Sequence, residues 1–130
     1  MASRSSLLRS ARGALAILTL INLFNYLDRY VVAALVESLR HSELHPSDLQ
    51  LGSLVTAFVV VYMAASPVFG VLGDRRSRPP LLGVGIAVWS VATAAGGLAR
   101  SFFALFSARA AVGVGEASYG AIAPALLADA

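Results

Sequence analysis

Apolar residues form four long stretches along this chain, and short polar segments separate them. The stretches cover residues 13–36, 50–73, 80–99 and 102–128. A helix needs about 20 apolar residues to cross a hydrocarbon core of ~30 Å, so each stretch is long enough to span a membrane. The pattern therefore predicts an all-α, polytopic bundle of four transmembrane helices.

The composition also favours a membrane protein over a soluble domain. Apolar residues make up 58% of the chain and charged residues only 13%, whereas a soluble domain usually has roughly a quarter of its residues charged. The mean hydropathy is +0.76. The ten basic residues give a formal net charge of +3 but are spread along the chain, so we expect no nucleic-acid partner. The absence of cysteine excludes a disulfide framework.

The arginines fall unevenly on the two sides of the predicted bundle. Arg40 and Arg100 lie on one side, and the other side has six: Arg4, Arg9, Arg12, Arg75, Arg76 and Arg78. The positive-inside rule then places both chain ends in the cytoplasm. We therefore expect residues 1–12 to form a basic cytoplasmic segment and residues 13–130 to form the membrane domain. The expected location is the plasma membrane, which in a bacterium is the inner membrane. The Arg- and Ser-rich start also suits an organellar transit peptide, which is the less favoured interpretation.

Four ionisable residues lie well inside the apolar stretches: Asp28, Arg29, Arg109 and Glu116. Each costs several kcal/mol at the bilayer centre unless it faces protein or water. Two interpretations follow. The residues form structural ion pairs that fix one helix against another, or they form a substrate or proton site.

Helical geometry groups these residues into two faces. One stripe of the first helix contains Asn22, Asn25, Tyr26 and Arg29, with Asp28 at its border. One face of the fourth helix contains Arg109, Gly113, Glu116 and Gly120, and its glycines leave room for a neighbouring helix or a ligand. At 1.5 Å per residue, Asp28 and Arg109 lie at nearly the same depth, with Glu116 roughly 10 Å deeper. We therefore predict an Asp28–Arg109 pair, with Glu116 in the same cavity.

Local signals refine the ends and bends of the helices. Ser47 and Gln50 have the spacing of a capping box at the start of the second helix. His41 and His45 just before it have a spacing that could hold a metal, but no third ligand is nearby, so we expect loop histidines and neither a metal nor a cofactor. Two prolines inside the stretches, Pro67 and Pro124, each remove a helix hydrogen bond and predict bends.

The segment GVLGDRRSR, residues 70–78, resembles the loop between helices two and three of the major facilitator superfamily. The matching positions are Gly70, Leu72, Gly73, Asp74, Arg75 and Arg78, while Ser77 replaces the usual glycine. The resemblance implies a cytoplasmic gate. Its acid would contact a helix of the transporter's other half, and its arginine would pair with nearby acids.

Three further segments are similar to the Spinster branch of lipid transporters: INLFNYLDRY (21–30), SPVFGVLGDR (66–75) and RAAVGVGEASYGAIAPALLAD (109–129). This resemblance implies alternating-access transport by twelve helices in two halves, with helices one and four lining a central cavity. It also implies roles in substrate binding and proton-linked switching for Asp28, Arg109 and Glu116. We assign Asn25, Tyr26 and Arg29 to the same site. The expected partners are membrane lipid, protons and a lipid or amphiphilic organic-anion substrate.

The length of the chain leaves several functional interpretations open. A complete facilitator needs about 400 residues for its twelve spans, so we interpret these four helices as an N-terminal fragment of the first half, without the C-terminal half. The alternatives are an organic-anion symporter of the same superfamily, which shares N-Y-x-D-R and G-x-G-E, and a small four-helix oligomer with a structural role. An enzyme is not expected. The glycines of VGVGEASYG mimic a nucleotide fingerprint, but they lack the preceding strand that a nucleotide site requires.

Overall fold

The computed structural model describes residues 4–129, except the side chains of residues 4–9 and 35. It contains four helices: α1 (Arg4–Arg40), α2 (Asp48–Arg75), α3 (Arg78–Gly97) and α4 (Phe102–Asp129). The described residues include no strand. Each helix contains a segment long and apolar enough to cross a membrane, and in α1 this segment is Ser10–Ala34. The prediction of an all-α bundle of four transmembrane helices is confirmed.

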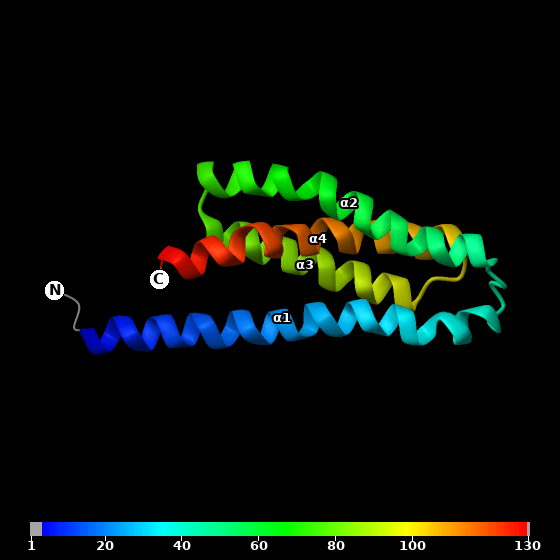
Figure 1. The fold of residues 1–130 in the computed structure, drawn as a ribbon, viewed down its shortest axis with the longest axis horizontal. Helices are drawn as coiled ribbons and strands as arrows, with labels where there is room; N and C mark the ends of the chain where they lie inside the picture. Colours follow the sequence, from blue (N-terminus) through cyan, green and yellow to red (C-terminus); the bar gives the residue numbers. More distant parts are fainter. Residues whose placement is uncertain (1–3, 130) are drawn as a thin grey trace.

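Successive helices run in opposite directions (Figure 1). The start of α1, the α2–α3 connection and the end of α4 lie at one end of the bundle. The α1–α2 and α3–α4 connections lie at the other end. The arginines of the α2–α3 connection are therefore at the same end as the basic start of α1, as four successive membrane crossings require.

Most helix boundaries lie a few residues outside the predicted apolar stretches, and two of them differ in informative ways. α1 begins at Arg4, so the expected lead-in is already helical there and is continuous with the first span. α3 ends at Gly97 instead of residue 99, because the adjacent Gly96 and Gly97 weaken the helix. The amide of Leu98 closes the end of α3 by donating to the carbonyl oxygens of Ala94 and Ala95, at 3.2 Å each.

Local side chains set the helix starts. The predicted capping box is confirmed: Ser47 Oγ accepts from the Gln50 amide at 3.2 Å, and Gln50 Oε1 accepts from the Ser47 amide at 2.9 Å. At the start of α4, Ser101 Oγ accepts from the Ala104 amide at 3.1 Å. α3 begins with prolines in its first turn, where no intrahelical amide donor is needed.

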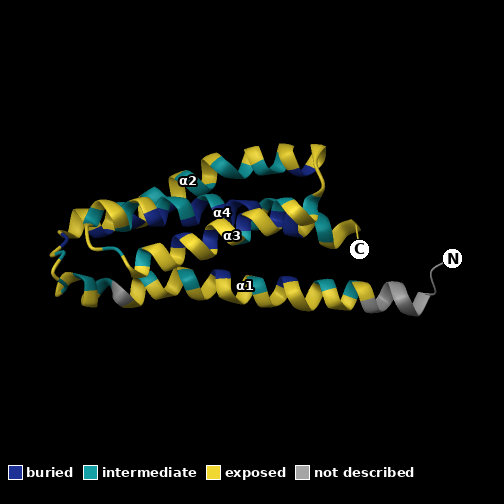
Figure 2. Cartoon of the chain, turned by 180° about the vertical axis from the view of Figure 1, so that it is seen from behind, coloured by how far each residue is buried: buried dark blue, intermediate teal, exposed yellow. Residues whose placement is uncertain are grey.

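The core of the bundle lies around α4, which packs between α2 and α3 (Figure 2). Two clusters of buried side chains surround it: Leu18, Leu82, Ile122 and Ala123, and then Phe58, Trp89, Ala92 and Val112. A Cβ at Gly115 would lie only 2.6 Å from the Cβ of Trp89, and one at Gly113 only 2.8 Å from the carbonyl oxygen of Phe58. The glycines of α4 therefore admit the neighbouring helices, as the sequence predicted for Gly113.

In contrast to α4, α1 lies along one side of this core and exposes many apolar side chains, among them Leu15, Ile17, Leu20, Leu23, Phe24 and Leu27. Figure 2 shows the described part of α1 largely exposed, whereas α4 is buried along its middle. One hydrogen bond ties the two helices together away from the charged residues: the Tyr119 hydroxyl donates to the carbonyl oxygen of Leu18 at 2.8 Å.

Candidate functional site

The first ion pair of the site joins α1 to α4. Arg109 Nη1 donates to Asp28 Oδ2 at 3.1 Å, and both side chains are nearly buried. The hydroxyl of Thr93 on α3 donates to the other carboxylate oxygen at 3.4 Å. Three helices therefore meet at the Asp28 carboxylate. The predicted Asp28–Arg109 pair is confirmed as a contact.

A second ion pair lies beside the first. Arg29 Nε donates to Glu116 Oε2 at 3.3 Å. The Glu116 side chain is fully buried, whereas that of Arg29 is 43% exposed. Glu116 Oε1 is buried and has no hydrogen-bond partner among the described residues. The adjacent residues Asp28 and Arg29 of α1 thus pair with one basic and one acidic residue of α4. The formal charges of the four residues sum to zero.

Two aromatic side chains of α2 complete the cluster. The guanidinium of Arg29 lies 5.6 Å from the ring centroid of Phe58 and 5.6 Å from that of Tyr62. The guanidinium of Arg109 lies 5.1 Å from the Phe58 centroid. These separations are within the range of cation–π attraction. Phe58 therefore contacts both arginines of the site.

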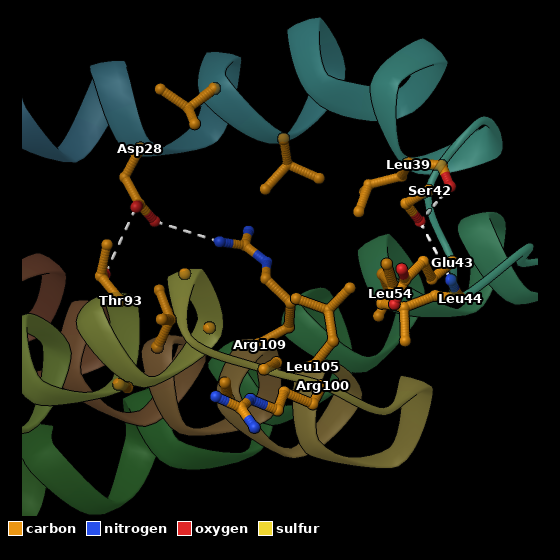
Figure 3. A pocket seen from close by; sticks show the side chains of 18 residues that line it. Asp28, Leu39, Ser42, Glu43, Leu44, Leu54, Thr93, Arg100, Leu105 and Arg109 are labelled. Carbon is orange, nitrogen blue, oxygen red and sulfur yellow. Dashed lines mark hydrogen bonds and ion pairs between the residues drawn. The ribbon is translucent and has the colours of Figure 1, made fainter.

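A cavity of about 630 Å³ opens next to the first ion pair, between α1, α3, α4 and the α1–α2 connection. Asp28, Thr93 and Arg109 line one part of it, and Ser42, Glu43 and Arg100 line another. Figure 3 shows Arg109 reaching across this space to Asp28. Much of the remaining wall is apolar, and the size suits a small organic ligand. An apolar wall that also carries two arginines and two acids can receive an amphiphilic ligand.

The structure corrects the expected position of Glu116. We predicted that Glu116 shares the cavity of Asp28 and Arg109, but it does not line that cavity. It is covered because α2 approaches α4 closely: a Cβ at Gly113 or Gly120 would collide with Phe58 or Tyr62. Glu116 therefore reaches the first pair only through its neighbours in the cluster.

The remaining predicted residues of α1 differ in position. Asn25 is buried, with 5% of its surface exposed. Asn22 is exposed, and so is Tyr26, which forms no ion pair or hydrogen bond through its side chain within residues 10–129 as described. The shared stripe of the helix thus brings Asn25 and Arg29 toward the bundle, but it does not bring Tyr26 into the ion-pair cluster.

Comparison with known proteins decides the family. The Major Facilitator Superfamily matches residues 18–130. The chain belongs to this superfamily. It is 41% identical over 125 residues to Protein spinster of Drosophila melanogaster, covering 96% of this chain and 20% of that protein. It is 44% identical over 115 residues to Protein spinster homolog 1 of Xenopus tropicalis, covering 87% of this chain and 22% of that protein.

A third relative carries a substrate in its name. The chain is 41% identical over 124 residues to the sphingosine-1-phosphate transporter of Xenopus tropicalis, covering 93% of this chain and 24% of that protein. The resemblance to the Spinster branch is therefore confirmed. The chain spans about a fifth to a quarter of the length of these facilitators.

Arg78 makes several contacts at the loop that resembles the facilitator motif between helices two and three. Its Nε donates to the carbonyl oxygen of Gly73 at 3.2 Å, and its Nη1 donates to that of Ala125 at 3.4 Å. It also pairs with Asp129 on α4 and lies 3.7 Å from Asp74 on α2. Arg78 therefore joins the ends of α2 and α4 to the start of α3.

The other motif residues of this facilitator loop are less engaged. Gly73 is buried, and a Cβ there would make an ordinary contact with Ile122. Gly70 has open space around it. Asp74 is 78% exposed. Arg75 lines a groove between α2 and α3.

Three parts of the candidate site were not predicted from the sequence. They are the Arg29–Glu116 pair, the hydrogen bond from Thr93, and the two aromatic rings. A usable signal existed for the rings: Phe58 and Tyr62 are four residues apart, on one face of α2, and Gly113 and Gly120 share one face of α4. That pattern predicts where two helices approach closely, but not that arginines lie over the rings.

Proposed function

We propose that this chain forms the first four helices of a facilitator that transports an anionic amphiphile by alternating access. The observation that carries the proposal is the neutral cluster of two acid–base pairs between α1 and α4, beside a cavity of about 630 Å³. Charges at this depth in a membrane span are costly and typical of functional sites. The name of the sphingosine-1-phosphate transporter supports a phosphate-bearing lipid as the substrate class.

Each charged residue has a distinct role in this proposal. Arg109 binds the anionic head group of the substrate, because it lines the cavity and its Nε has no partner among the described residues. Asp28 holds Arg109 until the anion replaces it. Asn25 and Tyr26 belong to the substrate route along α1, and the other half of the transporter completes the cavity.

Proton coupling belongs to Asp28 and Glu116 in this proposal. If the substrate anion takes Arg109, the Asp28 carboxylate loses its cation, and removing one partner of a buried pair leaves an uncompensated charge. A proton on Asp28 would restore neutrality. The same reasoning applies to Glu116 when Arg29 leaves it.

The test is uptake of sphingosine 1-phosphate or a lysophosphatidate by the complete transporter in liposomes. We expect uptake of the phosphate-bearing lipid but not of the same lipid without its phosphate. Asp28→Asn combined with Arg109→Gln removes both charges without leaving either unpaired. If the charges act in transport, this double variant folds but does not transport. Full transport by the double variant would instead support a purely structural ion pair.

We propose the orientation that the positive-inside rule gives, with the α2–α3 connection and both chain ends in the cytoplasm. Ser42 lies in the α1–α2 connection and Ser77 in the α2–α3 connection. Cysteines placed there should react with an impermeant reagent from opposite sides of the membrane. Reaction of both from the outside would contradict this topology.

A further inference from the structure

We propose that Phe58 of α2 is a positioning residue that holds both arginines of the site and couples its two ion pairs. The inference rests on the proposed function only for its consequence in transport. Phe58 is uncharged and acts through its aromatic ring. Its aromatic face lies 5.6 Å from the Arg29 guanidinium and 5.1 Å from that of Arg109.

Both arginines have a reason to use the ring. Arg29 is held by Glu116 through one hydrogen bond at 3.3 Å, and Arg109 Nε is buried without a hydrogen-bond partner among the described residues. A desolvated cation that is incompletely paired gains from the negative face of an aromatic ring. Phe58 thus supplies attraction that the two carboxylates leave incomplete.

The position of the ring is fixed by close packing. Phe58 is buried and packs with Trp89, Ala92 and Val112, so it belongs to the core that α4 forms with α2 and α3. Gly113 lets the α2 backbone approach α4 at this point, because a Cβ there would lie 2.8 Å from the Phe58 carbonyl oxygen. The ring therefore keeps a fixed place relative to Arg109, which is also on α4.

Arg29 is different, because it comes from α1 and is partly exposed. Tyr62 extends the aromatic surface under it, with its ring centroid 6.0 Å from that of Phe58. When Glu116 loses Arg29, the guanidinium stays over these rings, available to an anion. A change at the second ion pair then alters the attraction that Phe58 gives to Arg109. That shared ring is the coupling between the pairs.

The experiment is a double-mutant cycle, measured as thermal unfolding midpoints of the complete transporter in nanodiscs without ligand. The cycle combines Asp28→Asn with Glu116→Gln, and it is repeated with Phe, Tyr and Leu at position 58. A double-mutant cycle isolates the interaction between two sites from their separate effects. We expect non-additive shifts with Phe or Tyr and nearly additive shifts with Leu. Equal non-additivity in all three backgrounds, or additivity in the native background, would overturn the proposal.

A second measurement separates the aromatic face from mere packing. Mono-, di- and trifluorophenylalanine at position 58 keep the shape of the ring while weakening its negative face. The midpoint should fall steadily with each fluorine. The matched control is Phe69, on the same helix and packed on the Leu18–Ile122 cluster, with no guanidinium over it among the described residues. A fluorine series with equal slopes at both positions would show that only packing is involved.

The consequence for transport is tested with one charged and one neutral probe. Phe58→Leu should weaken binding of a lysophosphatidate by about 2- to 30-fold, the range that a cation–π contact supplies. Binding of the monoacylglycerol with the same chain should not change. Phe58→Tyr should retain the native binding of the lysophosphatidate. If the native transporter binds neither probe, the proposed function is wrong. The unfolding measurements without ligand still test the role of Phe58 in that case.

Discussion

α4 and α1 are both transmembrane helices with charged residues at mid-span, but they are held in different ways. α4 is buried between α2 and α3 and packs through small residues such as Gly113 and Gly115. α1 buries few apolar side chains within the described bundle, among them Leu18. Its contacts with α4 are dominated by two ion pairs and by the hydrogen bond from Tyr119.

This difference separates the closely packed part of the bundle from the part that contains its mid-span charges. Close packing of small residues fixes α2, α3 and α4 against one another, because van der Waals contact is the main attraction between helices in lipid. The polar groups are concentrated at the α1–α4 interface instead. Separating α1 from α4 therefore breaks few apolar contacts, but it exposes the largely buried charges of Asp28, Arg109 and Glu116.

The largest loss of stability should come from breaking the first ion pair, which joins α1 to α4. Asp28→Asn leaves Arg109 nearly buried without its carboxylate, and an uncompensated buried charge costs ~3–5 kcal/mol. The free energy of unfolding, measured by chemical denaturation in lipid nanodiscs, should fall by that order. Asp28→Asn with Arg109→Gln should recover part of the loss, because neither charge is then left unpaired. A double variant that is destabilised by the sum of the single effects would contradict the pairing.

The packing of α4 is tested next, at the contact with α3. Gly115→Ala puts a Cβ 2.6 Å from both the Cβ and the backbone nitrogen of Trp89, so the helices must separate. Overpacking of this kind costs about 1–3 kcal/mol. The matched control is Gly83→Ala on α3, where nothing lies within 4 Å and the better helix former should be neutral or stabilising. Equal destabilisation by both alanines would show that the close approach at Gly115 is not needed.

The sequence was sufficient for the fold and for one pair of the site. Apolar length predicted four helices, and the fixed rise per residue placed Asp28 and Arg109 at one depth, which the 3.1 Å contact confirms. The rise per residue gives the depth of a side chain, but it does not show which neighbouring helix that side chain faces. Asp28 and Arg29 point about 100° apart, and nothing in the sequence showed that both reach α4. The Arg29–Glu116 pair was therefore missed.

The aromatic part of the site was hidden for a different reason. Phe58 and Tyr62 lie in the apolar run of α2, where an aromatic residue is equally suited to the core, to lipid or to a cation. Only the three-dimensional approach of α2 to α4 puts their rings next to the guanidiniums. In the same way, sharing a stripe with Arg29 placed Tyr26 in the predicted site, whereas its side chain is exposed in the structure.

A smaller effect is expected from the hydrogen bond between α1 and α4. Tyr119→Phe removes the hydroxyl that donates to Leu18 and leaves the ring in place. A hydrogen bond of this kind contributes about 0.5–1.5 kcal/mol. The same change at Tyr30, which is exposed on α1, should have almost no effect on unfolding. If both variants unfold alike, the Tyr119 hydrogen bond does not help to hold α1 against α4.

The smallest effect on stability should come from the proposed gate, the loop around Asp74. Asp74 is 78% exposed and lies 3.7 Å from Arg78, and exposed ion pairs contribute less than ~1 kcal/mol. Asp74→Asn should therefore leave the unfolding of the α2–α3–α4 core almost unchanged.

In the complete transporter, Asp74→Asn should nevertheless shift the populations of inward-open and outward-open states, because the proposed gate holds the two halves together. Spin-label distances across the end of the transporter that contains the α2–α3 connection would measure that shift. Asp48→Asn, at the opposite end of α2, is the matched control, since its exposed carboxylate pairs with Arg40 at 2.8 Å. State populations that respond equally to both variants, or to neither, would contradict a gating role for Asp74.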